Sequence, residues 1–249
     1  DVLTSVSILA SEMRKKLIDL KVVGITGSQG KTTTKDMLHT VLASAGKTIA
    51  PIGSYNNDIG VPITLLRCNF ETKFCILEMG ARHMGDIGKL TQIGLPDVGI
   101  VLKVGVAHLG EFGSRENIAK TKGELIRGLR EGATAVLGDF DEFTPNMADG
   151  LNLKKYLFGI SNKDDFRAAD IEVKGGFATF DLVTPESREH VELQVLGEHQ
   201  IPNALAAAAA AFALGLSTGQ IASALSSHKS SSKWRMDLKK FAQITVIND

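Results

Sequence analysis

The chain has 249 residues, 43% of them hydrophobic and 22% charged, which is an ordinary balance for a globular protein. A formal net charge of zero argues against a broad nucleic-acid-binding surface, and no apolar stretch approaches the ~20 residues of a membrane span. The two cysteines, Cys68 and Cys75, lack the spacing of a metal site or a disulfide framework, which favours reduced thiols and a cytoplasmic setting.

Apolar runs alternate with helical patterns along most of the chain. We expect strands at 21–25, 74–79, 98–104 and 133–137, and helices at 32–45, 86–93, 118–128 and 203–214. This alternation predicts an α/β fold, in which a mostly parallel, P-loop mononucleotide-binding sheet is flanked by helices. Between about 168 and 196 the hydrophobicity alternates with period two, and we expect a small antiparallel β flank there.

The first strand runs directly into a glycine-rich turn at 24–34, Gly-Ile-Thr-Gly-Ser-Gln-Gly-Lys-Thr-Thr-Thr. A strand, a glycine-rich turn and a helix form the context of a phosphate-binding loop, in which Lys31 reaches the terminal phosphates and Thr32 ligates Mg²⁺. The loop is a variant, because the usual spacing would place a glycine at Ile25. The alternative is a plain turn with a surface lysine.

Four further segments end strands or open helices. They are the Asn- and Gly-rich loop 53–62, Glu78 after an apolar run, the turn 107–114 with His108, and the lysine-containing segment 119–125. A carboxylate at the end of a buried strand is costly unless it is paired or bound to a metal. Each segment also has an ordinary interpretation: a local Asx turn, a salt-bridged rim residue, a structural histidine, or solvated lysines.

Taken together, these segments resemble the Mur ligases of bacterial cell-wall synthesis. The resemblance rests on Asn-Asn-Asp-Ile-Gly-Val-Pro at 56–62, Glu-Met-Gly-Ala at 78–81 and Ala-His-Leu at 107–109, together with the loop 25–35 and the segments 112–114, 119–124 and 197–207. It covers roughly residues 21–216. The chain departs from the family at Gln29, where a smaller residue or Asn is usual, and at Gln200, where Asn is frequent.

The resemblance implies a role for each matching position. It implies an ATP site made by Gly27, Ser28, Gln29, Gly30, Lys31, Thr32, Thr33, Asn203, Arg235 and Asp249. It implies two Mg²⁺ sites, with Thr32 at the first and Glu78 and His108 at the second. Lys122 resembles the family's carbamylated lysine, and Lys120 remains the competing candidate. Lys31, Lys122, His108 and Glu78 are therefore the expected catalytic residues, and Asn57 and Asp58 are expected to bind substrate.

The implied activity is ATP-dependent amide ligation through an acyl phosphate. The loop at 56–62 favours the family member that joins D-Ala-D-Ala to UDP-MurNAc-tripeptide. We expect residues 1–20 to be a linker or helix from a missing N-terminal domain and 21–249 to be the central ATP-binding domain, with the C-terminal domain absent. The parent protein is then expected to be a monomer, and this fragment alone to be inactive.

Three alternatives remain open. The chain is a different Mur ligase or a folylpolyglutamate-type ligase, a P-loop nucleotide-binding module that does not ligate, or a small-molecule kinase. Glu78, His108 and Lys122 favour a ligase over a plain nucleotide switch, because a switch needs neither a second metal site nor a carbamate.

Overall fold

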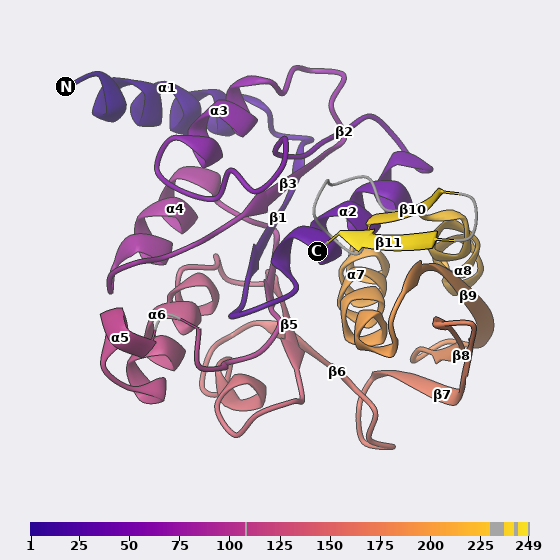
Figure 1. Ribbon diagram of the computed structural model, residues 1–249. Coiled ribbons are helices and arrows are strands. Elements are labelled where there is room, and N and C mark those ends of the chain that lie inside the picture. Colours follow the sequence, from indigo (N-terminus) through magenta and orange to yellow (C-terminus); the bar gives the residue numbers. More distant parts are fainter. Residues whose placement is uncertain (108, 230–236, 242–243, 249) are drawn as a thin grey trace.

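A nine-stranded sheet organises the computed structural model of the chain, which describes residues 1–107, 109–229, 237–241 and 244–248 (Figure 1). Its strands are β1 (Lys21–Thr26), β2 (Thr48–Ile49), β3 (Phe74–Glu78), β4 (Val98–Val101), β5 (Thr134–Gly138), β6 (Lys154–Gly159), β7 (Phe166–Lys174), β8 (Phe177–Val183) and β9 (Arg188–Leu196). They lie in the order β2-β3-β1-β4-β5-β6-β7-β8-β9. Pairing is parallel from β2 to β7 and antiparallel from β7 to β9. The predicted α/β fold with an antiparallel flank is confirmed.

Helices cover both faces of the parallel part of the sheet. Figure 1 shows α1, α3, α4 and α6 on one side and α2, α7 and α8 on the other. The helices are α1 (Val2–Lys16), α2 (Lys31–Ala43), α3 (Gly60–Leu66), α4 (Asp86–Gly94), α5 (Leu109–Phe112), α6 (Arg115–Arg127), α7 (Ile201–Ala213) and α8 (Thr218–Ser227), with short 3₁₀ turns η1 (Thr144–Asn146) and η2 (Glu198–Gln200).

Successive residues of the strands supply two separate cores. In β1, Val22 belongs to the core beneath α1, α4 and α6, whereas Val23 and Ile25 belong to the core beneath α2 and α7. Strand side chains alternate between the two faces of a sheet, so a strand covered on both faces must be apolar at every position. The apolar runs of the sequence therefore mark the central strands.

Helix α7 is buried because it is made largely of alanine. Its residues 204–211 are inaccessible to solvent, and the helix packs against both the sheet and the neighbouring helix α2. A helix that is apolar all round is expected in the interior, and small side chains allow its neighbours to approach closely. This packing brings the start of α7 next to the start of α2, which follows the glycine-rich turn.

Several elements differ from the sequence-based expectation. The strand expected at 98–104 ends at Val101, and β6, α3 and α8 were not predicted. Helix α3 begins within the segment expected to be a loop, where the Asn57 side chain accepts hydrogen bonds from two backbone N–H groups. The apolar strand at the end of the chain, β11 (Ile244–Asn248), pairs antiparallel with β10 (Asp237–Phe241) in a separate two-stranded sheet.

In the part of the chain that the structure describes, no helix has both the length and the apolar character needed to span a membrane.

A buried ion pair joins α1 to the edge of the sheet where the parallel strands begin. Arg14 donates from Nη2 to Asp97 Oδ2 over 3.1 Å, and the backbone N–H of Val22 donates to the same oxygen over 2.8 Å. Arg130 donates to the other carboxylate oxygen, but its side chain is mostly exposed, whereas Arg14 and Asp97 are buried. Asp97 therefore connects α1, β1 and the start of β4.

Replacing Arg14 is expected to cost much more stability than replacing Arg130. Arg14→Ala leaves the buried Asp97 carboxylate without its buried partner and should lower the free energy of unfolding by about 3 kcal/mol. Arg130→Ala removes an exposed partner and should cost under about 1 kcal/mol. Urea unfolding of the two variants measures the difference, and equal losses would contradict this account.

Candidate active site

The glycine-rich turn between β1 and α2 has the backbone of a phosphate-binding loop. Gly30 has φ +83°, a left-handed conformation that favours glycine, and a Cβ atom there would collide with the Asn203 side chain. Gly30 also caps the N-terminus of α2, where unpaired N–H groups and the helix dipole attract anions. The turn is therefore built to bind a phosphate group.

Neighbouring segments hold this loop in place. The Ser28 N–H donates to the Lys103 carbonyl over 3.0 Å, and the Gly105 N–H donates to Ser28 Oγ over 2.9 Å. Lys31 Nζ donates to the Gly27 carbonyl over 2.9 Å, which keeps the ammonium group against the loop. Gln29 is exposed at the tip of the turn. These contacts fix the loop against the chain that follows β4.

Glu78 is the buried carboxylate of the site. It is the last residue of β3, it is only 1% exposed, and its register partner in β1 is Ile25, just before the loop. Thr32 Oγ1 donates to Oε2 over 3.1 Å, and Asn56 Nδ2 donates to Oε1 over 2.9 Å. A carboxylate beside a hydroxyl offers the oxygen ligands that Mg²⁺ prefers, so these residues fit that ion.

Asn56 and Lys35 are contributors that the sequence reasoning did not single out. The backbone oxygen of Asn56 accepts from the Gly80 N–H over 2.7 Å, so this residue joins its loop to the end of β3. Lys35 Nζ donates to the Gly53 carbonyl over 3.0 Å and pairs with Asp36 at 2.8 Å. Both residues lie in the quoted motifs, but spacing alone did not distinguish Asn56 from its neighbour Asn57.

The Asn57 side chain contacts the backbone before α3, whereas its neighbour Asn56 contacts Glu78. Asn57 Oδ1 accepts from the N–H groups of Ile59 and Gly60 over 3.3 and 3.0 Å, and both Asn57 and Asp58 are exposed. The Asn57 side chain thus binds backbone N–H groups at the start of α3.

Lys122 is a buried amine on α6, and its position differs from that of Lys120. Lys122 is 9% exposed, whereas Lys120 faces solvent. Burial, and to a smaller extent the positive charge of Lys31, lowers the pKa of Lys122 to about 7. Glu124 on the same helix accepts from the N–H groups of Gly85 and Gly88 over 2.7 and 2.9 Å, which joins α6 to the start of α4.

Asn203 lies at the start of α7, against the phosphate-binding loop. Its Oδ1 accepts from Thr34 Oγ1 over 3.3 Å, and its Nδ2 donates to Gln200 Oε1 over 2.9 Å. Asn203 is therefore held in one orientation beside Gly30.

The structure brings most of the predicted site residues to one edge of the sheet. That group comprises Gly27, Ser28, Gln29, Gly30, Lys31, Thr32, Thr33, Glu78, Lys122 and Asn203. His108, Arg235 and Asp249 lie outside the described residues. Within the described ranges, no group of three or more His, Cys, Asp or Glu side chains is arranged to hold a metal ion.

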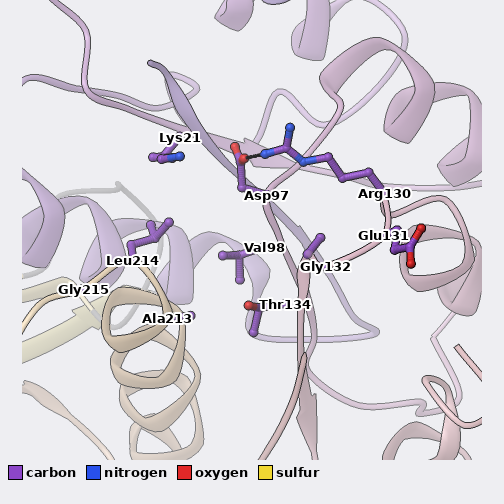
Figure 2. A pocket seen from close by; sticks show the side chains of 11 residues that line it. Lys21, Asp97, Val98, Arg130, Glu131, Gly132, Thr134, Ala213, Leu214 and Gly215 are labelled. Atoms are coloured by element: carbon purple, nitrogen blue, oxygen red, sulfur yellow. Dashed lines mark hydrogen bonds and ion pairs between the residues drawn. The ribbon is translucent and has the colours of Figure 1, made fainter. Parts of the chain in front are cut away.

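A cavity of about 590 Å³ lies at the opposite edge of the sheet (Figure 2). Its lining includes Lys21, Val98 and Thr134, the first residues of β1, β4 and β5. Figure 2 shows the Arg130 guanidinium pointing at Asp97 on its wall, in the ion pair described above. The cavity is therefore distinct from the candidate site, which lies where β1 and β3 end.

Known proteins are similar to this chain in both sequence and fold. The UDP-N-acetylmuramoyl-tripeptide--D-alanyl-D-alanine ligase of Mycobacterium tuberculosis is 40% identical over 252 residues, which cover 100% of this chain and 49% of that protein. The crystal structure of MurF from Acinetobacter baumannii has a TM-score of 0.94 at 36% identity and covers 100% of this chain and 55% of that one. MurF from Thermotoga maritima, solved in complex with ADP, has a TM-score of 0.87 at 29% identity, with 100% and 57% covered.

The chain spans about half the length of the curated relatives it matches. Residues 25–211 match the Mur ligase middle domain. That range includes the glycine-rich loop, Glu78, Lys122 and Asn203. The chain therefore belongs to the Mur ligase family and contains its middle domain.

Proposed function

We propose that this chain is the ATP-binding central domain, residues 21–249 with a preceding linker helix, of an ATP-dependent ligase that joins D-Ala-D-Ala to UDP-MurNAc-tripeptide. The names of relatives that align with the whole length of this chain support this substrate pair. The observation that favours it most is the buried Glu78 carboxylate, which contacts Thr32 of the phosphate-binding loop. We propose a monomeric parent protein that acts in the cytoplasm.

The chemistry has two steps. The terminal carboxylate of the tripeptide attacks the γ-phosphorus of ATP, which gives an acyl phosphate and ADP. The amine of D-Ala-D-Ala then attacks the acyl carbon and loses a proton, and inorganic phosphate leaves from the tetrahedral intermediate. The first step brings two anions together, so the site must offset their repulsion and align the reacting atoms.

In this proposal the residues of the chain share that task. Lys31 and the N–H groups at the start of α2 bind the β- and γ-phosphates, Asn203 contacts the adenine, and Arg235 and Asp249 contact the phosphates and ribose. Thr32 holds one Mg²⁺, and Glu78 and His108 hold a second. Bound Mg²⁺ would neutralise phosphate charge and polarise the transferring group. Asn57 and Asp58 contact the muramoyl substrate.

Lys122 is proposed to act as a carbamate. The neutral amine adds to the carbon of CO₂, and a proton is released as the carbamate anion forms. An ordinary lysine is neutral in less than about one molecule in a thousand at pH 7, because its pKa is near 10.4. Lys122, with a pKa of about 7, is neutral in roughly half of the molecules, so it reacts far more readily. The buried product would be an anion beside Lys31.

The alternatives differ in what each reaction requires. Another Mur or folylpolyglutamate-type ligase would accept a different amine in place of D-Ala-D-Ala. A non-ligating nucleotide-binding module or a small-molecule kinase would release or transfer phosphate without any dependence on an amine.

Phosphate release by the full-length parent, measured with UDP-MurNAc-tripeptide in the presence and absence of D-Ala-D-Ala, tests the proposed function. Release that does not depend on D-Ala-D-Ala would overturn it.

Lys122→Ala is expected to lower the ligation rate of the full-length parent by about 100-fold, because it removes the group that becomes the supporting anion. Short carboxylic acids should restore part of the rate by occupying the space of the carbamate. Lys120→Ala is the matched control, because Lys120 is exposed on the same helix, and it should leave the rate unchanged. A larger loss for Lys120→Ala would assign the carbamate to that residue.

Glu78→Gln is expected to raise the Mg²⁺ concentration required for half-maximal ligation by about tenfold or more, because the amide keeps the size of the side chain but loses its charge. A Mg²⁺ titration of the rate at saturating substrates measures this shift. Glu71→Gln is the control, since Glu71 pairs with Lys47 on the surface. An unchanged Mg²⁺ requirement in Glu78→Gln would argue against a metal at this carboxylate.

The 249-residue chain is expected not to ligate when it is supplied with both substrates, because it spans about half of its relatives. The measurement is amide product formed by the chain beside the same molar amount of the full-length parent. A product rate above background from the chain alone would contradict the expectation that this half of the protein is insufficient for ligation.

A further inference from the structure

Two aspartates meet at the end of β5 and β6, away from the site described above. Asp139 directly follows β5, and Asp164 lies in the turn between β6 and β7. Both side chains pass over Gly159: a Cβ atom at that glycine would collide with the Asp164 carboxylate and would lie 3.4 Å from the Asp139 Cβ. The Asp139 side chain and the Asp164 carboxylate therefore lie next to each other above Gly159.

Asp164 is buried in a way that leaves part of its carboxylate unsatisfied. The residue is only 3% exposed, and its Oδ2 accepts from the Ser161 N–H over 2.8 Å. Its Oδ1 is also shielded from water and has no hydrogen-bond donor among the described residues. A buried oxygen of this kind costs free energy unless a donor or a cation meets it.

The surroundings of Asp164 are negative. Burial, and then the neighbouring Asp139 and Asp165 carboxyl groups, raise the pKa of the Asp164 carboxyl, whereas the Ser161 N–H lowers it. Asp139 is exposed to solvent. Either a shared proton or a bound cation must relieve the repulsion between the two groups.

We propose that Asp139 and Asp164 form a binding site for Mg²⁺ that is separate from the nucleotide site. Mg²⁺ is commonly held by one or two carboxylates and keeps several waters, and the exposed side of Asp139 leaves room for those waters. Oδ1 of Asp164 is the inner ligand in this proposal, because it accepts no hydrogen bond from the described residues.

The sheet order separates this site from Glu78. Strands β1 and β4 lie between β3, which ends at Glu78, and β5, which precedes Asp139. Three strand spacings correspond to roughly 14 Å. An ion at the aspartate pair would connect the end of β5 to the turn that leads into the antiparallel flank, and it would stabilise the folded chain.

The test is the thermal unfolding of the 249-residue chain, without nucleotide, as Mg²⁺ is added. A ligand that binds only the folded state, at about tenfold above its dissociation constant, should raise Tm by about 4 °C. Asp164→Asn should abolish the rise. Its amide oxygen can still accept from the Ser161 N–H, and the amide carries no charge beside Asp139, so this variant should fold and should be more stable than the parent chain without Mg²⁺.

Two controls separate this site from its neighbours. Asp165→Asn removes an adjacent charge but keeps an oxygen to accept from the Leu157 N–H, so its rise in Tm should persist. Glu78→Gln should also keep the rise, since that carboxylate belongs to the nucleotide site. Crystals soaked in Mn²⁺ should give an anomalous peak between Asp139 and Asp164.

Three results would overturn the proposal. The first is no Mg²⁺-dependent rise in the parent chain, which would favour a shared proton between the aspartates. The second is a rise that Asp164→Asn retains. The third is a rise that Glu78→Gln abolishes, which would assign the ion to the nucleotide site.

Discussion

The buried carboxylate of Glu78 is the constraint around which the candidate site is built. A negative charge at the end of a strand that is covered on both faces requires partners, and it obtains them from two other segments of the chain. Thr32 comes from the first turn of α2, and Asn56 comes from the loop before α3. Any shift of β3 along β1 would separate all three groups, so the parallel register of these strands also sets the geometry of the site.

The position of Glu78 follows from the strand order. From β1 the chain moves out to β2, returns to β3 between β2 and β1, and then crosses to β4 on the other side of β1. Loops that leave neighbouring strands in opposite directions open a crevice at the carboxyl ends of those strands, which is where ligands bind in open α/β sheets. The glycine-rich loop leaves β1 at this crevice, and Glu78 and the chain after β4 flank it. Topology therefore places the site before any side chain is considered.

The sequence was sufficient to predict the glycine-rich loop and the central strands, because both have local sequence signatures. Glycines followed by Lys31 and Thr32 mark a phosphate-binding turn, and uninterrupted apolar runs mark strands covered on two faces. Strand β6 was missed because its first two residues are lysines, and α8 was missed although its buried residues Ile221, Ala222, Ala224 and Leu225 follow helical spacing. The difference in burial between Lys120 and Lys122 could not be predicted without the packing of α6, since nearby positions of a helix differ in which one faces the interior. The aspartate pair joins residues 25 positions apart, so no local pattern predicts it.

The two ends of the parallel strands differ in how completely the charged groups near them are paired. Where the strands begin, Asp97 is matched by Arg14, Arg130 and a backbone N–H, so the charged groups there form a closed and stabilising set. Where the strands end, the Lys122 amine is buried near the positive charge of Lys31, and Asp164 has an oxygen without a donor among the described residues. Such arrangements cost stability, and they become favourable only when an ion, a phosphate or a carbamate supplies the missing charge. The cavity lies at the edge where the strands begin, whereas the candidate site lies at the edge where the charged groups are less completely paired.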